Sequence, residues 1–152
     1  MRITLVAVGR LKAGAARALY EHYAARLRWR LAAKEVEERR SLPPEALKEQ
    51  EAGLLLAALP RGARVVALDE AGREMSSREF AELLGRWQDE GVQDLAFLIG
   101  GADGLADRAR EAADLTLSLG PMTWPHMLVR GLLAEQLFRA ESILAGHPYH
   151  RD

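Results

Sequence analysis

The stretch Leu95–His126, LAFLIGGADGLADRAREAADLTLSLGPMTWPH, holds two apolar runs that each end in glycine. The first run, Leu95–Ile99, is rich in strand-forming residues and breaks at Gly100-Gly101. The second run, Leu115–Leu119, breaks at Gly120-Pro121. Short, continuously apolar runs of this kind are typical of buried parallel strands. Because parallel strands of an open sheet bind ligands at their carboxyl ends, we expect both glycine turns to lie at a ligand crevice.

Strand and helix patterns alternate along the rest of the chain. We predict strands at 2–8, 31–36, 64–68, 95–99 and 115–119, and helices at 15–27, 44–59, 103–113 and 127–144. Ser76 and Glu79 have the spacing of a capping box, which predicts a further helix through Trp87, and residues 69–72 read as a turn. Five strands alternating with helices predict an α/β protein with a mainly parallel sheet flanked by helices. The length of 152 residues fits a single domain over 1–152.

The residue composition excludes several classes of site and location. There is no cysteine, so disulfides, thiolate zinc sites and cysteine nucleophiles are excluded. No apolar run reaches the roughly 18 residues that span a bilayer, and the run at 3–8 is too short for a signal sequence, so we expect a cytoplasmic protein. His147 and His150 have a spacing that metal ligands use, but they lack a third ligand and we predict no metal site. His126 follows a proline and opens a helix, which favours capping or packing.

Charge is unevenly distributed along the chain. The whole sequence has a net charge of -1, but residues 1–40 hold ten Lys and Arg against four Asp and Glu. The remaining residues hold 11 Lys and Arg against 18 Asp and Glu. This asymmetry favours a polyanionic partner at one end of the molecule, although a solvated basic surface explains it equally well.

Two nucleotide-binding motifs are absent from the sequence, and their absence limits the class of ligand that we expect. The turn after the first strand, Gly9–Gly14, lacks the GxGxxG spacing of dinucleotide sites, and no GxxxxGK[ST] phosphate loop occurs. The predicted crevice has glycine turns and apolar walls, which are Leu68, Ile99, Leu119, Met122 and Trp124. Such a pocket suits a neutral adenosine with a sulfonium group beside it.

At this point the sequence resembles the RlmH family of SPOUT-class methyltransferases, and the resemblance runs from end to end. The residues that carry it are Val8–Lys12, Leu68–Glu70 with Ser76–Ala81, Leu98–Gly101 with Gly104-Leu105, Trp124–His126, Ala134–Ala140 and His147–Arg151. The resemblance implies a SPOUT-type fold with a C-terminal trefoil knot. It also implies transfer of a methyl group from S-adenosylmethionine (SAM) to N3 of a pseudouridine in 23S rRNA.

The resemblance also assigns residues to the site. Carried over by position, the SAM-binding residues are Leu68, Gly100, Leu119, Gly120, Pro121, Met122, Thr123 and Trp124. The tail residues Tyr149, His150 and Arg151 would approach the target base as catalytic residues.

Elementary chemistry suggests roles for two of the tail residues. Methyl transfer from a sulfonium is an in-line displacement, so alignment of donor and acceptor supplies much of the rate. The imide N3 of a uracil-like ring becomes nucleophilic when its proton leaves, and the negative charge spreads onto two carbonyl oxygens. Arg151 can stabilise that charge, and His150 is a candidate for receiving the proton, which solvent can also take.

Partners follow from the same patterns. The helix at 127–144 is apolar on more than one side, which favours one contact with the sheet and another with a second subunit. We therefore expect a homodimer in which the tail of one subunit completes the pocket of the other. A chain of net charge -1 gains little from counterion release, so we expect the assembled ribosome to be the substrate. The alternatives are a non-catalytic RNA-binding or ribosome-binding α/β dimer and, less favoured by the basic N-terminal segment, a SAM-dependent enzyme acting on a small molecule or protein.

Overall fold

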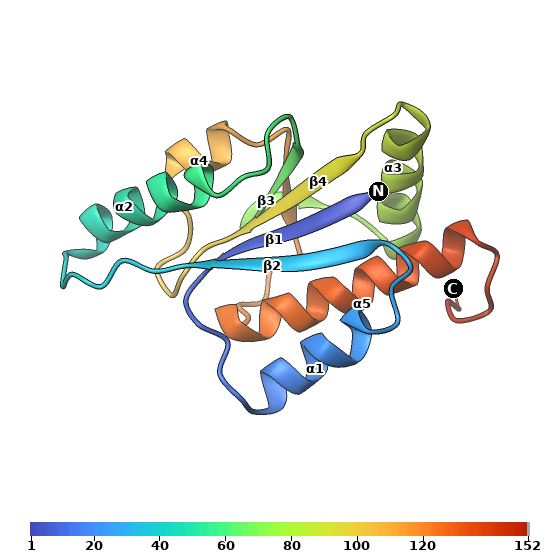
Figure 1. The fold of residues 1–152 in the computed structure, drawn as a ribbon, viewed down its shortest axis with the longest axis horizontal. Coiled ribbons are helices and arrows are strands. Elements are labelled where there is room, and N and C mark those ends of the chain that lie inside the picture. Colours follow the sequence, from blue (N-terminus) through green and yellow to red (C-terminus); the bar gives the residue numbers. More distant parts are fainter. Residues whose placement is uncertain (152) are drawn as a thin grey trace.

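The strands of the central sheet all run in the same direction. The computed structural model describes residues 1–151, within which five strands and five helices alternate (Figure 1). The strands are β1 (Arg2–Val8), β2 (Arg30–Val36), β3 (Arg64–Glu74), β4 (Asp94–Ile99) and β5 (Leu115–Ser118). They pair in the order β2-β1-β4-β3-β5, and each pair is parallel. The predicted fold class is confirmed; Asp152, the last residue of the predicted domain, lies outside the described residues.

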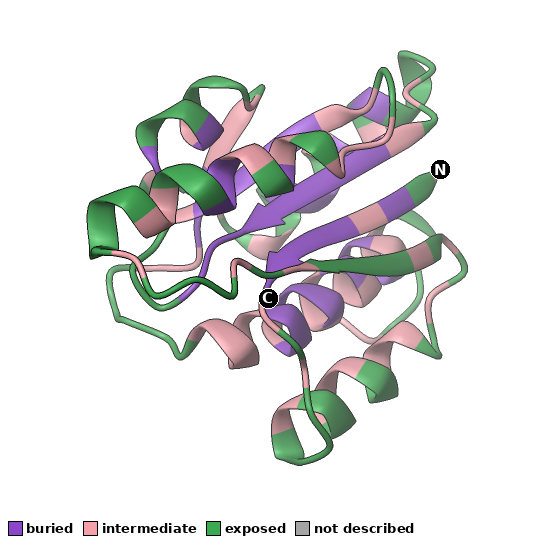
Figure 2. Ribbon diagram, turned by 60° about the vertical axis from the view of Figure 1, so that its left-hand side comes forward, coloured by how far each residue is buried: buried purple, intermediate pink, exposed green. Residues whose placement is uncertain are grey.

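Helices cover both faces of the sheet and form two separate cores. The helices are α1 (Ala15–Ala24), α2 (Pro44–Ala57), α3 (Ser77–Asp89), α4 (Asp107–Glu111) and α5 (His126–Leu144). Successive strand residues point to opposite faces, so Leu5 joins the core beneath α3 and α5, whereas Val6 joins the core beneath α2 and α4. Figure 2 shows the central strands buried and the edge strand β2 largely exposed.

Helix α3 begins where the sequence predicts it. The Ser76 side chain accepts a hydrogen bond from the Glu79 backbone N–H at 3.1 Å, and the Glu79 carboxylate accepts one from the Ser76 N–H at 2.7 Å. The predicted capping box is confirmed, and Phe80, Leu84 and Trp87 of this helix are buried.

The predicted helix at 103–113 is wrong for its first turn. Only Asp107–Glu111 is helical, because the preceding residues form a tight turn. In that turn Gly104 has a φ of 82° and its N–H donates to the Gly101 carbonyl at 3.0 Å. Ala106 is extended at the helix N-cap. Helix α1 is also shorter than predicted and ends at Ala24.

Strand β3 is longer than predicted and carries a large bulge. Leu68 and Arg73 both pair with Leu117 of β5, so residues 69–72 loop out of the ladder and the strand resumes at Arg73. The loop therefore interrupts the strand instead of ending it. Gly72 allows this approach, since a Cβ on Gly72 would lie 2.8 Å from backbone atoms of Thr116.

Helix α5 lies between other helices of the same chain. It packs against α1 and α3, and its residues Leu133, Leu137 and Ala140 are buried against the sheet. The two-sided apolar pattern of this helix is therefore accounted for within one chain, and by itself it does not require a second subunit. The tail after α5 ends at the opposite end of this helix from its start (Figure 1). Within residues 1–151, no helix combines the length and apolarity needed to cross a membrane.

Candidate cofactor cavity and C-terminal tail

A cavity of about 710 Å³ opens at the carboxyl edge of the sheet. It is formed by the bulge of β3 and by the segments that follow β4 and β5, and β3 lies between the other two strands. The cavity brings together most of the predicted SAM-binding residues, namely Leu68, Gly100, Leu119, Gly120, Met122, Thr123 and Trp124. Pro121 is exposed and does not line the cavity. Both predicted glycine turns therefore lie at one cavity at this edge of the sheet, as the sequence predicted.

The glycines of the cavity permit close backbone packing. A Cβ on Gly100 would lie 2.8 Å from the carbonyl carbon and oxygen of Gly104, so the loop after β4 can close only on glycine. Gly120 has a φ of 109° and faces open space, and its N–H donates to the Ser118 hydroxyl at 3.1 Å. These turns leave backbone groups facing the cavity where a side chain would otherwise project.

The apolar walls of the cavity include side chains that are unusually exposed. Met122 is 71% exposed and Trp124 is 41% exposed, whereas Leu68 and Ile99 behind them are buried. Large apolar side chains left open at a concave surface are typical of a ligand site. This arrangement suits a flat heteroaromatic ring.

Charged residues also line the cavity, and none of them was assigned to the site from the sequence. Asp69 accepts a hydrogen bond from Arg110 at 3.1 Å, and Glu70, Lys48 and His126 also line the cavity. The bulge in β3 carries the two carboxylates into position, and this register shift has no signature in a single sequence. His126 opens α5 behind Pro125 without a side-chain cap, so of the two roles predicted for it capping is wrong, and packing stays a prediction.

The residues present fit SAM. The volume lies within the range of small-molecule sites, the walls can take an adenine ring, and the two glycine loops offer backbone groups for its polar edge. The zwitterionic amino-acid end of SAM would meet side chains of both signs at the mouth, where Glu70 and Lys48 lie. Among its described lining residues, the cavity has neither the loop nor the cation cluster of a triphosphate site.

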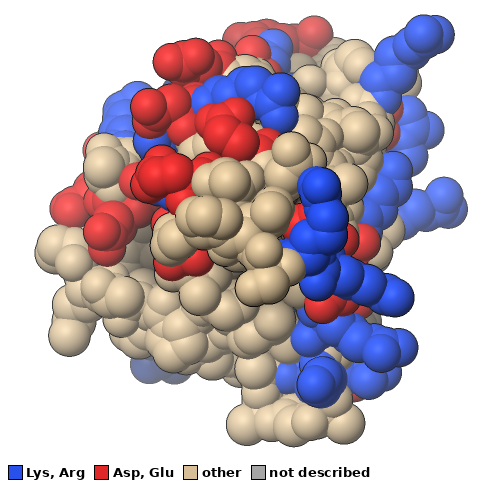
Figure 3. All heavy atoms as spheres, turned by 90° about the vertical axis from the view of Figure 1, so that its left-hand side faces the viewer, with Lys and Arg blue, Asp and Glu red and all other residues tan. Residues whose placement is uncertain are grey.

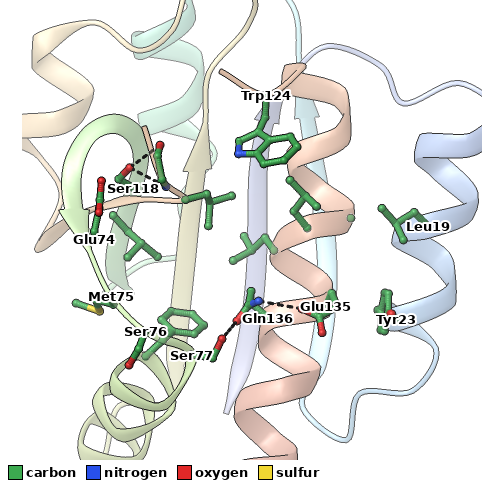
Figure 4. A pocket seen from close by; sticks show the side chains of 17 residues that line it. Leu19, Tyr23, Glu74, Met75, Ser76, Ser77, Ser118, Trp124, Glu135 and Gln136 are labelled. Carbon is green, nitrogen blue, oxygen red and sulfur yellow. Dashed lines mark hydrogen bonds between the residues drawn. The ribbon is translucent and has the colours of Figure 1, made fainter. Parts of the chain in front are cut away.

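A second cavity of about 510 Å³ adjoins the first and shares Leu117, Leu119, Gly120 and Trp124 with it. Figure 4 shows this second cavity between the end of β3, α5 and α1. Its floor is organised by polar contacts, because Ser77 donates to Gln136 at 2.7 Å and Gln136 donates to Glu135 at 3.0 Å. Trp124 stands at one end of the cavity, and Glu135 and Tyr23 stand at the other (Figure 4).

The tail folds back onto α5 and reaches this second cavity. The Tyr149 hydroxyl lies 3.1 Å from Glu135 and 3.4 Å from the Tyr23 hydroxyl, and the Tyr149 ring packs edge-on against Phe138. The Arg139 guanidinium lies 4.9 Å from the centre of the Tyr149 ring. Burial of the Tyr149 hydroxyl, helped by Tyr23 and Glu135, raises the pKa of this phenol above its ordinary value, so it stays protonated.

The tail does not reach the first cavity of its own chain. Glu135, where Tyr149 is held, lies six residues along α5 from Val129, the nearest residue of this helix that lines the first cavity, which is about 9 Å at 1.5 Å per residue. Arg151 is exposed. His150 Nδ1 lies 3.1 Å from Arg139 Nη1, and because a guanidinium only donates, Nδ1 accepts this hydrogen bond. Within one chain, the three predicted catalytic residues are therefore apart from the predicted cofactor residues.

Comparison with known proteins defines the class. A family model described as predicted SPOUT methyltransferase matches residues 1–150. Since the match covers nearly the whole chain, this protein belongs to the SPOUT methyltransferase family.

More particular similarities exist within that class. Proteins named Ribosomal RNA large subunit methyltransferase H are similar to this chain over 151 residues, with 60% identity for that of Rhodospirillum centenum and 61% for that of Paramagnetospirillum magneticum. In both cases the match covers 99% of each chain. The resemblance to the RlmH family is thereby confirmed.

A solved structure supports the fold assignment. The SpoU methyltransferase AviRb from Streptomyces viridochromogenes, in complex with AdoMet, superposes with a TM-score of 0.51 at 15% identity. The superposition covers 92% of this chain and 58% of that one, so this chain spans under two thirds of the length of AviRb. At this identity the likeness concerns the fold alone.

Proposed function

We propose that this protein transfers the methyl group of SAM to N3 of a pseudouridine in 23S rRNA, on the assembled ribosome. One observation carries the proposal. A cavity framed by the glycine turns at 100–104 and 119–120 lies at the carboxyl edge of a parallel sheet, in a chain 60% identical from end to end to a protein named Ribosomal RNA large subunit methyltransferase H. Its place of action would be the cytoplasm, where ribosomes are.

The cofactor would lie in the first cavity. Leu68, Leu119 and Trp124 would enclose the adenine, and the loops at Gly100 and Gly120 would offer it backbone groups. When bound, SAM supplies an electrophilic methyl group on a sulfonium, which becomes a neutral thioether after transfer. No covalent enzyme intermediate is needed, so the residues contribute mainly by holding donor and acceptor in line.

The acceptor base would be activated by the tail. N3 would have to lose its proton before it could accept the methyl group that bound SAM would supply. We assign to Arg151 the stabilisation of the negative charge on the carbonyl oxygens that flank N3. The Tyr149 phenol remains protonated and holds the tail on α5 through Glu135.

His150 can take the N3 proton only after a local rearrangement. In the described arrangement its Nδ1 accepts a hydrogen bond from Arg139, so in the neutral ring the proton sits on Nε2. Nδ1 becomes a base only if Arg139 moves. Solvent is therefore the simpler proton acceptor, and we expect His150→Gln to retain much more activity than loss of Arg151.

The separation of tail and cavity supports a homodimer. None of Tyr149, His150 and Arg151 lines the cofactor cavity of its own chain, and Glu135, which holds Tyr149, lies about 9 Å along α5 from Val129, the nearest cavity residue of this helix. We propose that each cavity receives the tail of the partner subunit.

The test is transfer of labelled methyl from SAM to ribosomes that lack the modification, beside separated subunits and protein-free rRNA. We expect label in large-subunit rRNA of assembled ribosomes and a rate at least about 100-fold lower for Arg151→Ala, the effect of losing one stabilising donor. Arg61→Ala removes an exposed arginine with no side-chain partner among residues 1–151 and serves as the matched control.

Other outcomes would contradict particular parts of the proposal. Efficient labelling of protein-free rRNA would refute the ribosome as substrate. No label with SAM binding intact by calorimetry would refute the rRNA target. Loss of SAM binding as well would favour the non-catalytic adapter.

A further inference from the structure

Positive charge is concentrated in the first 40 residues, and all ten of their Lys and Arg side chains are exposed. Some of these cations are neutralised by neighbours, as Arg2 is by Asp94 and Arg17 is by Glu21. Others have no carboxylate within 4.0 Å in residues 1–151. Seven cations meet this criterion; Arg26 is held by His22 of α1, and we refer to the other six as the β2-edge cations, which are Arg10, Lys12, Arg28, Arg30, Lys34 and Arg39.

The β2-edge cations follow the free edge of the sheet toward the cofactor cavity. Strand β2 pairs only with β1 and forms one edge. Arg30 and Lys34 project from the side of β2 that faces α2, because Lys34 pairs with Val6 of β1, and the Lys34 ammonium donates to the Ala58 carbonyl after α2 at 3.1 Å. Arg39 follows the carboxyl end of β2, and Arg10 follows the carboxyl end of β1. A seven-residue strand is about 23 Å long, so this line of charge spans several phosphates of a nucleic-acid strand.

This line of charge ends beside the mouth of the cavity. Gly9, next to Arg10, lies so close to α5 that a Cβ on it would be 2.7 Å from the Met127 side chain. Met127 follows His126, which lines the cofactor cavity. The loop that bears Arg10 and Lys12 therefore borders the start of α5.

The opposite flank of the molecule has the opposite charge. Figure 3 looks at the carboxyl edge of the sheet and shows Lys and Arg side chains along one flank, with Asp and Glu side chains gathered over the other. On the α2 and α4 side, Glu45, Glu49 and Asp107 pair with Lys48, Arg108 and Arg110, whereas Asp103 and Glu111 make no ion pair within residues 1–151. A polyanion near the cavity would be attracted to one flank and repelled by the other, which fixes its direction of approach although the net charge is only -1.

We propose that the β2-edge cations are the surface on which the sugar–phosphate backbone of the substrate rRNA lies, beside the cofactor cavity. This inference rests on the proposed function, because it names the surface that brings the same substrate to the same site. The contacts are to phosphate, so they position the strand and carry no sequence preference.

The variant Arg30→Gln/Arg39→Gln tests this surface. Neither side chain makes a hydrogen bond or ion pair within residues 1–151, so its loss leaves the fold intact. The matched control is Arg61→Gln/Arg86→Gln, which removes two exposed arginines away from β2 and from the cavity. Filter binding and single-turnover methyl transfer are measured on ribosomes across a range of salt concentrations, and SAM binding is measured by calorimetry.

We expect ribosome binding by the β2-edge variant to weaken roughly tenfold at low salt. The slope of log affinity against log salt concentration should become shallower by about one for each phosphate that the variant no longer neutralises. Affinity for SAM and the transfer rate at saturating ribosome should match the control variant.

Two results would overturn the proposal. The first is ribosome binding equal to that of the control variant. The second is weakened binding with an unchanged salt slope, since it would indicate that these arginines touch a ribosomal protein. If the wild-type protein transfers no methyl group, the proposed function is wrong. The salt dependence of ribosome binding still tests whether the β2-edge cations contact phosphate.

Discussion

Glu51 of α2 is a carboxyl group buried directly under the glycine turn of the cofactor cavity. It is 7% exposed, and its Oε1 has no hydrogen-bond partner among residues 1–151. A Cβ on Gly101 would lie 3.1 Å from Glu51 Oε2, so the carboxyl group packs against the backbone of that turn. Burial, with Asp103 nearby, raises the pKa of Glu51 above its ordinary value. An uncompensated buried charge here weakens the fold when it ionises.

We therefore expect Glu51→Gln to be more stable than wild type at high pH. Since the pKa is raised in the folded state, the folded protein binds the proton more tightly than the unfolded chain does. Stability of the wild type should fall as pH rises from the ordinary pKa of a glutamate through the raised folded value. The variant should lack this fall, so the two melting temperatures should converge at low pH and separate at high pH. A gap that does not change with pH would show that the folded protein and the unfolded chain bind the Glu51 proton equally well, so that folding does not raise the pKa of Glu51.

Sequence reasoning located the cavity from its glycines but not its carboxylates. Gly100 and Gly120 carry a local signal, because each ends an apolar run. Glu51 and Glu70 carry none, since one reaches the site from the middle of a helix and the other through a bulge. Their positions depend on packing between distant segments, which a single sequence does not encode in any periodicity.

A single ion pair joins three elements at the basic edge of the sheet. Arg130 of α5 is 1% exposed, and its guanidinium contacts Glu35 of β2 at 2.5 Å and the Gly9 carbonyl after β1 at 2.7 Å. Glu35 also accepts a hydrogen bond from the Leu11 N–H at 2.7 Å. Although burial opposes it, these bonds hold the pKa of Glu35 below its ordinary value. The pair fixes the β1–α1 loop against α5.

The two members of this pair should respond differently to substitution. Glu35→Gln leaves the buried Arg130 charge without its carboxylate and should destabilise the fold by about 3 kcal/mol, the lower end for a broken buried pair. Arg130→Met leaves Glu35 partly open to water, so it should cost less. Urea unfolding of both variants and of the double variant measures this, and equal costs would show that the Arg130 charge is compensated by the carbonyls alone.

Helices and strands were predicted most accurately where a single pattern, such as an apolar run or a capping box, marked the segment. All five strands overlap their predicted ranges, although β3 continues beyond Leu68 to Glu74, and the α3 capping box lies at its predicted residues. The first turn of the predicted helix at 103–113 failed because Gly101 and Gly104 prefer a tight turn there. The looped residues 69–72 were recognised, but the return of the chain to β3 depends on pairing with β5, which local sequence does not specify.

At the scale of the whole molecule, the separation of tail and cavity predicts complementation between subunits. A Gly100→Arg subunit should bind no cofactor, because any side chain there meets the Gly104 backbone at 2.8 Å. An Arg151→Ala subunit should bind cofactor but lack the tail cation. Mixed and re-equilibrated, the two should recover up to about a quarter of wild-type activity, since half of all dimers would be mixed and each would have one intact site. Activity no higher than that of the separate variants would show that the site does not cross the interface.

Chain topology was the least predictable feature at this scale. Strand order places β3 between β4 and β5, and no feature of the sequence ranks that order above others. The trefoil knot implied by the RlmH resemblance stays a prediction, as does the homodimer. Both concern the path of the chain or a second copy, which amphipathic patterns do not determine.

The position of α5 has a consequence for biosynthesis. Leu133, Leu137 and Ala140 complete one of the two cores, yet they belong to α5, which is translated after all five strands of the sheet. Until that helix emerges, the nascent chain exposes an apolar sheet face that includes Leu5 and Phe97. We expect chains cut short before α5 to aggregate or to be degraded.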